Sequence, residues 1–238
     1  MRPVLIVRPE PGNAATAAVV KRRGLDAVRS PLTEIVPLEW AAPDPARFDA
    51  VLLGSANAVR CGGPGLGRLK TLPAYCVGEA TAQVAKDAGF SVAAVGEGEL
   101  QDLLPRLAGD RCTRALRLAG IDRVALTTPE GLTIDTVEVY AAELRPLSEA
   151  GATALRHGAV VLLHSAASAA RLLDECARLG IAHDTVPIAC LGPRIAAAAG
   201  AGWRAVAFAD QPTDAALLAL AGEMCQTAGC GVSTNTTG

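Results

Sequence analysis

Short, uninterrupted apolar runs alternate with alanine-rich segments along most of the chain. Residues 4–7 (VLIV) and 50–53 (AVLL) are such runs, and each is followed by a turn and a segment with helical spacing, the first at about residues 14–23. Continuous apolar strands that alternate with helices are typical of a parallel sheet covered on both faces. The pattern therefore predicts a doubly wound α/β fold.

Two segments depart from this rhythm. Residues 28–39 and 133–147 are extended, alternating and interrupted by proline, which suits a half-exposed antiparallel ribbon. Each lies where one series of strands and helices ends and another begins, so we interpret them as two linker strands. The predicted domains are a discontinuous first domain of residues 1–36 plus 147–226 and an inserted second domain of residues 40–132. The small, polar residues 227–238 are expected to form a disordered tail.

An internal repeat supports this division. Residues 49–60 (DAVLLGSANAVR) resemble residues 158–171 (GAVVLLHSAASAAR), and residues 72–96 resemble residues 186–209. The pairs Cys76 and Cys190, Gly78 and Gly192, and Leu103 and Leu217 keep one constant offset. The repeat predicts two related parallel-sheet domains that face each other across a cleft, one inserted in the other and joined by a two-stranded ribbon.

Composition and charge narrow the class of protein. The chain has 238 residues, of which 50% are hydrophobic, 19% charged and 3% aromatic, and its net charge is −2. These values argue against disorder and against a nucleic-acid surface. No apolar run is long enough for a membrane helix, and the first residues lack the apolar stretch of a signal peptide. We therefore expect a cytoplasmic protein that contacts neither membrane nor nucleic acid.

The cysteines and histidines do not predict a metal site. The seven cysteines form no CxxC pair, and the three histidines are not spaced as zinc ligands. We interpret the cysteines as reduced thiols that pack as small apolar side chains.

The candidate binding residues follow the predicted strands. Ligands of open parallel α/β sheets bind beyond the carboxyl ends of the strands, where helix N-termini offer free N–H groups to anions. At any single turn, plain helix capping is the favoured explanation for Ser55, Ser165 and Asn57. Several such turns around one cleft would suit a ligand with several carboxylates or phosphates. The candidates are Arg8, Ser55, Asn57, Gly78, Thr81, Ser165, Ser168, Gly192, Pro193 and Arg194.

Familiar catalytic motifs are missing from the sequence. It contains no GxGxxG, GxxxxGK[ST] or GxSxG pattern, and we interpret residues 63–67 (GPGLG) as a flexible loop. His164 follows a strand and is interpreted as a satisfied strand-end histidine, because no orienting partner is evident. Tyr140 lies in a predicted linker strand, where it is either an interface aromatic or a functional residue that faces the cleft.

An ordered set of short motifs carries a family resemblance. The motifs are Arg8-Pro9, SANAV at 55–59, VGEAT at 77–81, Val139-Tyr140, HSAAS at 164–168, LGPR at 191–194 and QPTD at 211–214. In this order they resemble the uroporphyrinogen-III synthase family, and the resemblance extends from residue 3 to about residue 225.

The resemblance implies a function and a set of roles. Enzymes of this family are cofactor-independent lyases of haem biosynthesis. They cyclise the linear tetrapyrrole hydroxymethylbilane with loss of water and inversion of ring D. The substrate carries eight carboxylates, which matches the strand-end residues, and the family's tyrosine corresponds to Tyr140 as a candidate general acid. The resemblance further implies a monomer without metal.

Departures from the family pattern lie at several of these positions. Gly54, His164 and Arg194 stand where the family often has hydroxyl residues. The short stretch between Gly120 and Tyr140 leaves little room for the helix often found there, so the inserted domain is expected to be trimmed on one side.

Two other classes compete with this interpretation. One is a non-enzymatic two-domain protein that closes on a small anion. The other is a flavodoxin-like nucleotide-binding enzyme, which is disfavoured because no glycine-rich phosphate loop follows the first strand.

Overall fold

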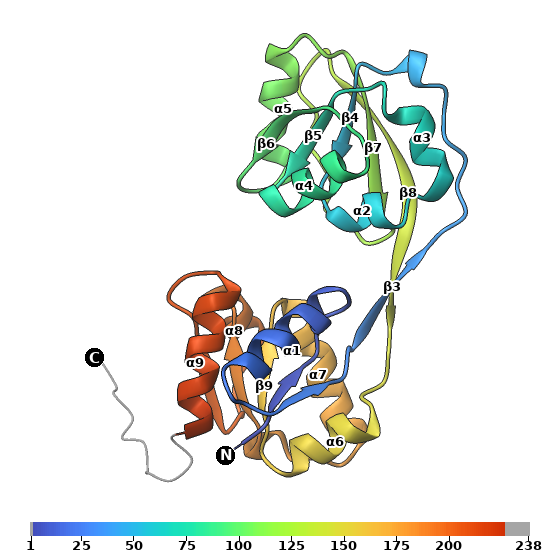
Figure 1. Cartoon of the computed structure of the whole chain (residues 1–238). Helices are drawn as coiled ribbons and strands as arrows, with labels where there is room; N and C mark the ends of the chain where they lie inside the picture. The colour runs from blue at the N-terminus through green and yellow to red at the C-terminus, as the bar shows by residue number, and fades with distance from the viewer. Residues whose placement is uncertain (1, 227–238) are drawn as a thin grey trace. The chain divides into compact units, whose positions relative to one another are not determined.

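The computed structural model describes residues 2–226, and the predicted tail lies outside this range. Two compact units make up the described chain. Unit 1 combines residues up to Glu34 with those from Leu144 onward, and unit 2 is Ile35–Glu143 (Figure 1). Within residues 2–226, none of the helices has both the length and the apolar character needed to cross a bilayer.

Unit 1 is built on a five-stranded parallel sheet with the order β11-β10-β9-β1-β2. The strands are β1 (Val4–Ile6), β2 (Ala27–Arg29), β9 (Val160–Leu163), β10 (Pro187–Cys190) and β11 (Ala205–Phe208). The helices are α1 (Gly12–Arg22), α6 (Glu149–Arg156), α7 (Ala166–Arg178), α8 (Pro193–Ala199) and α9 (Asp214–Gln226), with a 3₁₀ turn at His183–Thr185.

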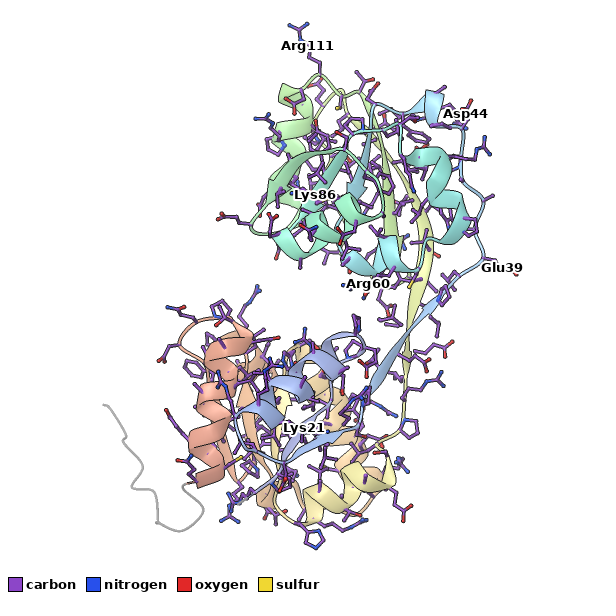
Figure 2. All side chains as sticks on the ribbon, in the orientation of Figure 1. Lys21, Glu39, Asp44, Arg60, Lys86 and Arg111 are labelled. Atoms are coloured by element: carbon purple, nitrogen blue, oxygen red, sulfur yellow. The ribbon has the colours of Figure 1, made fainter. Side chains whose placement is uncertain are left out.

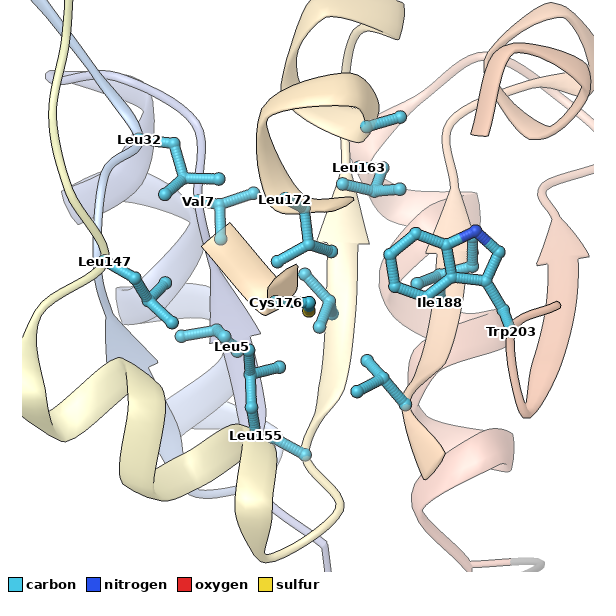
Figure 3. Packing of buried hydrophobic residues seen from close by; sticks show 14 of the residues in the cluster. Leu5, Val7, Leu32, Leu147, Leu155, Leu163, Leu172, Cys176, Ile188 and Trp203 are labelled. Atoms are coloured by element: carbon cyan, nitrogen blue, oxygen red, sulfur yellow. The ribbon is translucent and has the colours of Figure 1, made fainter. Parts of the chain in front are cut away.

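Helices cover both faces of this sheet. Residues of α1 and α9, such as Val20 and Leu217, pack with Ile6 on one face. On the other face, Leu155 of α6 and Leu172 of α7 pack with Leu5 and its neighbours (Figure 3). The apolar runs are therefore buried on both sides, as a parallel sheet requires.

Unit 2 contains a six-stranded sheet with the order β3-β8-β7-β4-β5-β6. The strands are β3 (Thr33–Pro37), β4 (Ala50–Leu53), β5 (Ala74–Val77), β6 (Val92–Gly96), β7 (Arg114–Gly120) and β8 (Thr133–Leu144). The helices are α2 (Ala56–Arg60), α3 (Leu66–Leu69), α4 (Glu79–Asp87) and α5 (Leu100–Gly109), with 3₁₀ turns at Pro45–Arg47 and Gly63–Gly65. Together the two sheets confirm the predicted doubly wound α/β class.

The sheets also confirm the internal repeat. Strands β6-β5-β4-β7-β8 lie in the same order as β11-β10-β9-β1-β2. The repeated pairs of the sequence fall on β4 with β9 and on β5 with β10. One difference stands out, since α1 connects β1 to β2 whereas residues 121–132 connect β7 to β8 without a helix. The expected trimming is therefore present at this connection.

The two alternating segments form more than a ribbon. The Leu38 N–H donates to the Val139 carbonyl and the Arg145 N–H to the Leu32 carbonyl, so β3 and β8 run antiparallel. The first half of β8, however, pairs parallel with β7, from Arg114↔Thr133 to Ala119↔Glu138. The sequence of this strand alternates as an exposed ribbon does because most of its residues are only partly buried or exposed.

The interpretation of residues 63–67 as a flexible loop is wrong. Gly63–Gly65 forms a 3₁₀ turn that leads directly into α3. The Trp40 Nε1–H donates to the Gly62 carbonyl at 3.0 Å, and a Cβ on Gly65 would lie 2.8 Å from Trp40 Cζ2. The glycines therefore let an indole ring approach the backbone closely.

Cysteines and surface charges behave as the composition suggests. The six described cysteines are free, and five of them are buried. Charged side chains such as Lys21, Arg60 and Arg111 are exposed, and that of Arg111 projects away from the protein (Figure 2). A buried cation is thus an exception in this protein.

Candidate functional site

A cavity of about 290 Å³ lies in unit 2, at the carboxyl ends of β4, β5 and β7. This is the edge at which parallel sheets bind ligands. The start of α5 and the connection after β7 enclose it on the sides. Its lining includes Ser55, Val77, Leu100, Arg117, Gly120 and Tyr140.

Tyr140 reaches the cavity because of a local irregularity in the sheet. The register of β7 with β8 shifts at the end of β7, where Ala119 pairs with Glu138 and Gly120 with Tyr140. The ring of Tyr140 then lies against Gly120, since a Cβ on that glycine would be 2.7 Å from Tyr140 Cε2. The missing side chain of Gly120 therefore leaves room for this ring position, which the sequence analysis did not anticipate.

Arg117 is a residue that the sequence analysis missed. It lies in the middle of β7, and only 9% of it is exposed. Its Nη1 donates to the Val124 carbonyl at 3.0 Å. Burial lowers the pKa of this guanidinium, the charge of Arg123 lowers it further, and Tyr140 acts in the opposite direction. A lone arginine inside an apolar strand (LRLAG) was the available signal.

A second hollow adjoins the same arginine. It has a volume of about 500 Å³ and is lined by Ile134, Thr136 and Glu138 of β8 together with Arg117 and Arg123. Arg123 is neutralised there, because its Nη1 lies 2.6 Å from the Glu138 carboxylate.

The other candidates of unit 2 lie at the starts of helices α2 and α4. Ser55 caps α2 by accepting a hydrogen bond from the Asn57 N–H at 3.2 Å. Gly78 begins α4 with a φ of +77°, a conformation that favours glycine, and Thr81 is buried one turn later. Of the predicted residues in this unit, Ser55 and Tyr140 thus lie together at the cavity, whereas Asn57, Gly78 and Thr81 do not line it.

In unit 1, Arg8 belongs to a charged network at the ends of β1 and β9. Its Nη1 lies 2.8 Å from Asp214 Oδ2, at the start of α9. The other oxygen of Asp214 lies 3.4 Å from His164 Nε2. Asp214 is the neighbour of His164 that could not be identified from sequence, because the chain brings it there from a distant segment.

His164 is not the satisfied strand-end histidine that we expected. Its side chain is 8% exposed, and within the described chain neither ring nitrogen has a well-formed hydrogen bond. Burial and the charge of Arg8 lower the pKa of His164 to about 4, against the opposing effect of Asp214. The imidazole is therefore neutral at pH 7.

The remaining candidates of unit 1 open two helices. Ser165 caps α7 by accepting from the Ser168 N–H at 3.1 Å, and the two hydroxyl oxygens are 2.9 Å apart. Gly192 and Pro193 begin α8, where proline suits the first helical position, and Arg194 is exposed. Nowhere in residues 2–226 do three or more metal-ligating side chains gather as a metal site.

Comparisons with known proteins identify the family. Among curated proteins, none matches the chain at a significant level. A uroporphyrinogen-III synthetase structure from Helicobacter pylori has 20% sequence identity and a TM-score of 0.65, covering 94% of this chain and 100% of its own. A mutant uroporphyrinogen III synthase from Thermus thermophilus has 17% identity and a TM-score of 0.53, covering 94% and 99%. At these identities the structures establish the fold.

The family assignment comes from the sequence itself. The family model described as uroporphyrinogen-III synthase HemD matches residues 14–219, which is most of the chain and includes parts of both units. The chain therefore belongs to the uroporphyrinogen-III synthase family.

Proposed function

We propose that this chain is a lyase of haem biosynthesis that cyclises hydroxymethylbilane to uroporphyrinogen III. The family match over residues 14–219 carries the proposal. The position of Tyr140 beside a cavity at the carboxyl ends of the strands supports it. The proposal includes action as a monomer in the cytoplasm, without added metal or organic cofactor and without a nucleic-acid or membrane partner.

The reaction depends more on orientation than on a strong nucleophile. Loss of hydroxide from the hydroxymethyl group leaves an azafulvene cation, and direct ring closure then yields the symmetric type I isomer. The protein must instead direct attack through the substituted α-carbon of ring D. The resulting spiro intermediate fragments and recloses with ring D inverted. Holding the chain of pyrroles in that geometry is the main catalytic task.

We assign Tyr140 the role of general acid for the departing hydroxide. Its phenol lies at the cavity, where it would donate a proton as the carbon–oxygen bond breaks. Helix N-termini and hydroxyls within each unit would bind the substrate carboxylates. The residues proposed for that role are Arg8, Ser55, Asn57, Gly78, Thr81, Ser165, Ser168, Gly192, Pro193 and Arg194.

Isomer analysis tests the proposed activity. The purified chain is incubated with freshly made hydroxymethylbilane, and the type III and type I products are separated. We expect the type III isomer, at a rate that a chelator leaves unchanged. Type I product alone, at the spontaneous rate, would overturn the proposal. Tight tetrapyrrole binding without turnover would then favour the alternative of a non-enzymatic small-anion-binding protein.

The role of Tyr140 has a matched control in the second tyrosine. Tyr140→Phe is expected to lower turnover about tenfold, less than a strong general acid contributes, because water can replace the phenol as proton donor. Tyr75 is buried in β5 and donates to Asp110 at 2.8 Å, outside the cavity lining. Tyr75→Phe should therefore leave turnover and the isomer ratio unchanged. Equal behaviour of the two variants would remove Tyr140 from the mechanism.

A further inference from the structure

The cavity of unit 2 contains a buried cation without an acidic partner. Arg117 is 9% exposed, and no described carboxylate lies within 4.0 Å of its guanidinium. Its hydrogen bond to the Val124 carbonyl uses one of the five guanidinium N–H donors. Burying a charge without a partner is costly, so this arrangement needs an explanation beyond packing.

The internal repeat shows that the fold does not require an arginine at this position. In unit 1 Ile6 pairs with Leu162, and in unit 2 Arg117 pairs with Leu52. Leu52 and Leu162 are equivalent in the repeated sequence, so Arg117 occupies the position of Ile6. Ile6 is fully buried between residues of α1 and α9. An aliphatic side chain therefore satisfies the same strand position where a helix covers it.

The missing helix makes room for the arginine. Residues 121–132 contain no helix, and Arg123, Val124 and Leu126 of this connection line the cavity with Arg117 and Tyr140. At about 290 Å³ the space is smaller than most pockets for a whole ligand, but it is large enough for one side arm of a large one.

The other charged groups around the cavity do not neutralise Arg117. The nearby carboxylate of Glu138 forms its ion pair with Arg123 and not with Arg117. Glu99 is the N-cap of α5 and forms no ion pair with Arg117. Asp122 lines the cavity and is exposed, but it forms no ion pair with Arg117.

We propose that Arg117 is a specificity-determining residue that binds one carboxylate side arm of the tetrapyrrole substrate, beside Tyr140. The planar guanidinium can hold a carboxylate through two parallel hydrogen bonds, and such charge-assisted pairs strengthen where water is excluded. The bound side arm would supply the counter-ion that the protein lacks here. This inference rests on the proposed function for the identity of the ligand.

The test compares two substitutions at Arg117 with a control on the same strand. Arg117→Met removes the charge and keeps an apolar chain of similar length, and Arg117→Lys keeps the charge without the planar fork. The control is Arg114→Met, since Arg114 pairs with Asp135 at 2.7 Å and does not line the cavity. Each variant is assayed for kcat and KM with hydroxymethylbilane and for the Kd of uroporphyrin III, an unreactive octacarboxylate, by fluorescence titration.

Arg117→Met is expected to raise both KM and the uroporphyrin Kd about tenfold or more, with kcat changed far less, because the contact is equal in ground and transition states. Arg117→Lys should give intermediate values, and Arg114→Met should match the parent. The urea midpoint of Arg117→Met should equal or exceed that of the parent, since the unpaired charge is gone.

Unchanged KM and Kd in a folded Arg117→Met variant would overturn the inference. If that variant does not fold, Arg117→Lys decides in the same way, with parental values overturning it. A third outcome is that the parent chain forms no type III isomer while Arg117→Met still weakens the binding of uroporphyrin III. That result would contradict the proposed function and support the carboxylate site.

Discussion

The two units have the same order of strands, but different helices cover one face of the sheet. In unit 1, α1 and α9 cover the face that carries Ile6. In unit 2, α5 packs on the equivalent face and the connection after β7 has no helix. The loss of one crossover helix turns a core position into the wall of a cavity. Related folds can thus acquire a site through a change in one connection, while the strands stay in place.

The units also differ in how they hold a buried charge. Glu175 of α7 is fully buried in unit 1 and lies 2.6 Å from Arg178 and 2.8 Å from Arg171. It also accepts a hydrogen bond from the Leu147 N–H at 2.8 Å, which fixes the chain where it enters α6. The Arg178 hydrogen bond lowers the pKa of Glu175 despite burial. Glu175 is satisfied by the protein, whereas Arg117 of unit 2 has no acidic partner.

One tryptophan in each unit allows these differences to be measured separately. Trp40 packs against the core of unit 2 and Trp203 lies in the core of unit 1, and the chain has two tryptophans. In a Trp40→Phe background, the fluorescence of the remaining Trp203 reports the urea unfolding of unit 1. In a Trp203→Phe background, Trp40 reports that of unit 2.

The largest effect on stability is expected from Glu175→Ala. It removes three contacts of a buried group and leaves two arginines without their partner, which should cost about 3 kcal/mol of unfolding free energy. The loss should appear in the Trp203 signal and leave the Trp40 signal in place. Equal shifts in both signals would show that the units do not unfold independently.

His164 should make unit 1 sensitive to acid. Its pKa is lowered from 6.5 to about 4 in the folded state, so below pH 6.5 the unfolded chain binds a proton that the folded chain does not. The free energy of unfolding of unit 1 therefore decreases by about 3 kcal/mol in total as the pH falls from about 6.5 to about 4. Arg8 and Asp214 are the charged groups that face His164.

The comparison with His164→Leu isolates this contribution, since Glu175 also loses stability in acid. Urea midpoints followed through Trp203 should fall less steeply with pH in the variant than in the parent. Unit 2 has Gly54 at the equivalent position, so its Trp40 signal should not distinguish the two proteins. Parallel pH profiles of parent and variant in the Trp203 signal would refute the role of His164.

Gly120→Ala tests how the cavity positions Tyr140. The added Cβ would lie 2.7 Å from the tyrosine ring, so the ring must move, and turnover should fall about tenfold, as in Tyr140→Phe. Adding Tyr140→Phe to Gly120→Ala should then cost little more. The control is Gly109→Ala at the end of α5, where a Cβ would meet nothing within 4 Å. Full activity in Gly120→Ala would show that the ring position is unimportant.

The smallest effects are expected from the two matched helix caps. Ser55→Ala and Ser165→Ala each remove one cap hydrogen bond, which should cost about 1 kcal/mol. Ser165 should matter more, because its hydroxyl also contacts Ser168 and its helix is longer. Each loss should appear in the tryptophan signal of its own unit. A larger effect for Ser55 would reverse this ranking.

Local patterns were sufficient for the apolar strands, the repeat and some of the cavity-lining residues. Apolar runs such as residues 50–53 must be buried on both faces, so they predict parallel strands wherever they occur. Ser55 and Ser165 are caps by residue type and position. Tyr140, found through the family resemblance, does line the cavity with Ser55. Glycine content misjudged residues 63–67, and alternation misjudged the first half of β8. In both cases the partner, Trp40 or β7, comes from elsewhere in the chain.

The sequence by itself thus determined where the apolar parallel strands lie, that the chain forms two related α/β halves, and which family it belongs to. These properties depend on periodicity and on motifs a few residues long. Only the tertiary structure brought Asp214 to His164 and Arg8, and only it laid Tyr140 over Gly120 and left Arg117 buried without an acidic partner. Such contacts join residues that are distant along the chain, and burial, which gives a charge its energetic weight, depends on every element packed around it.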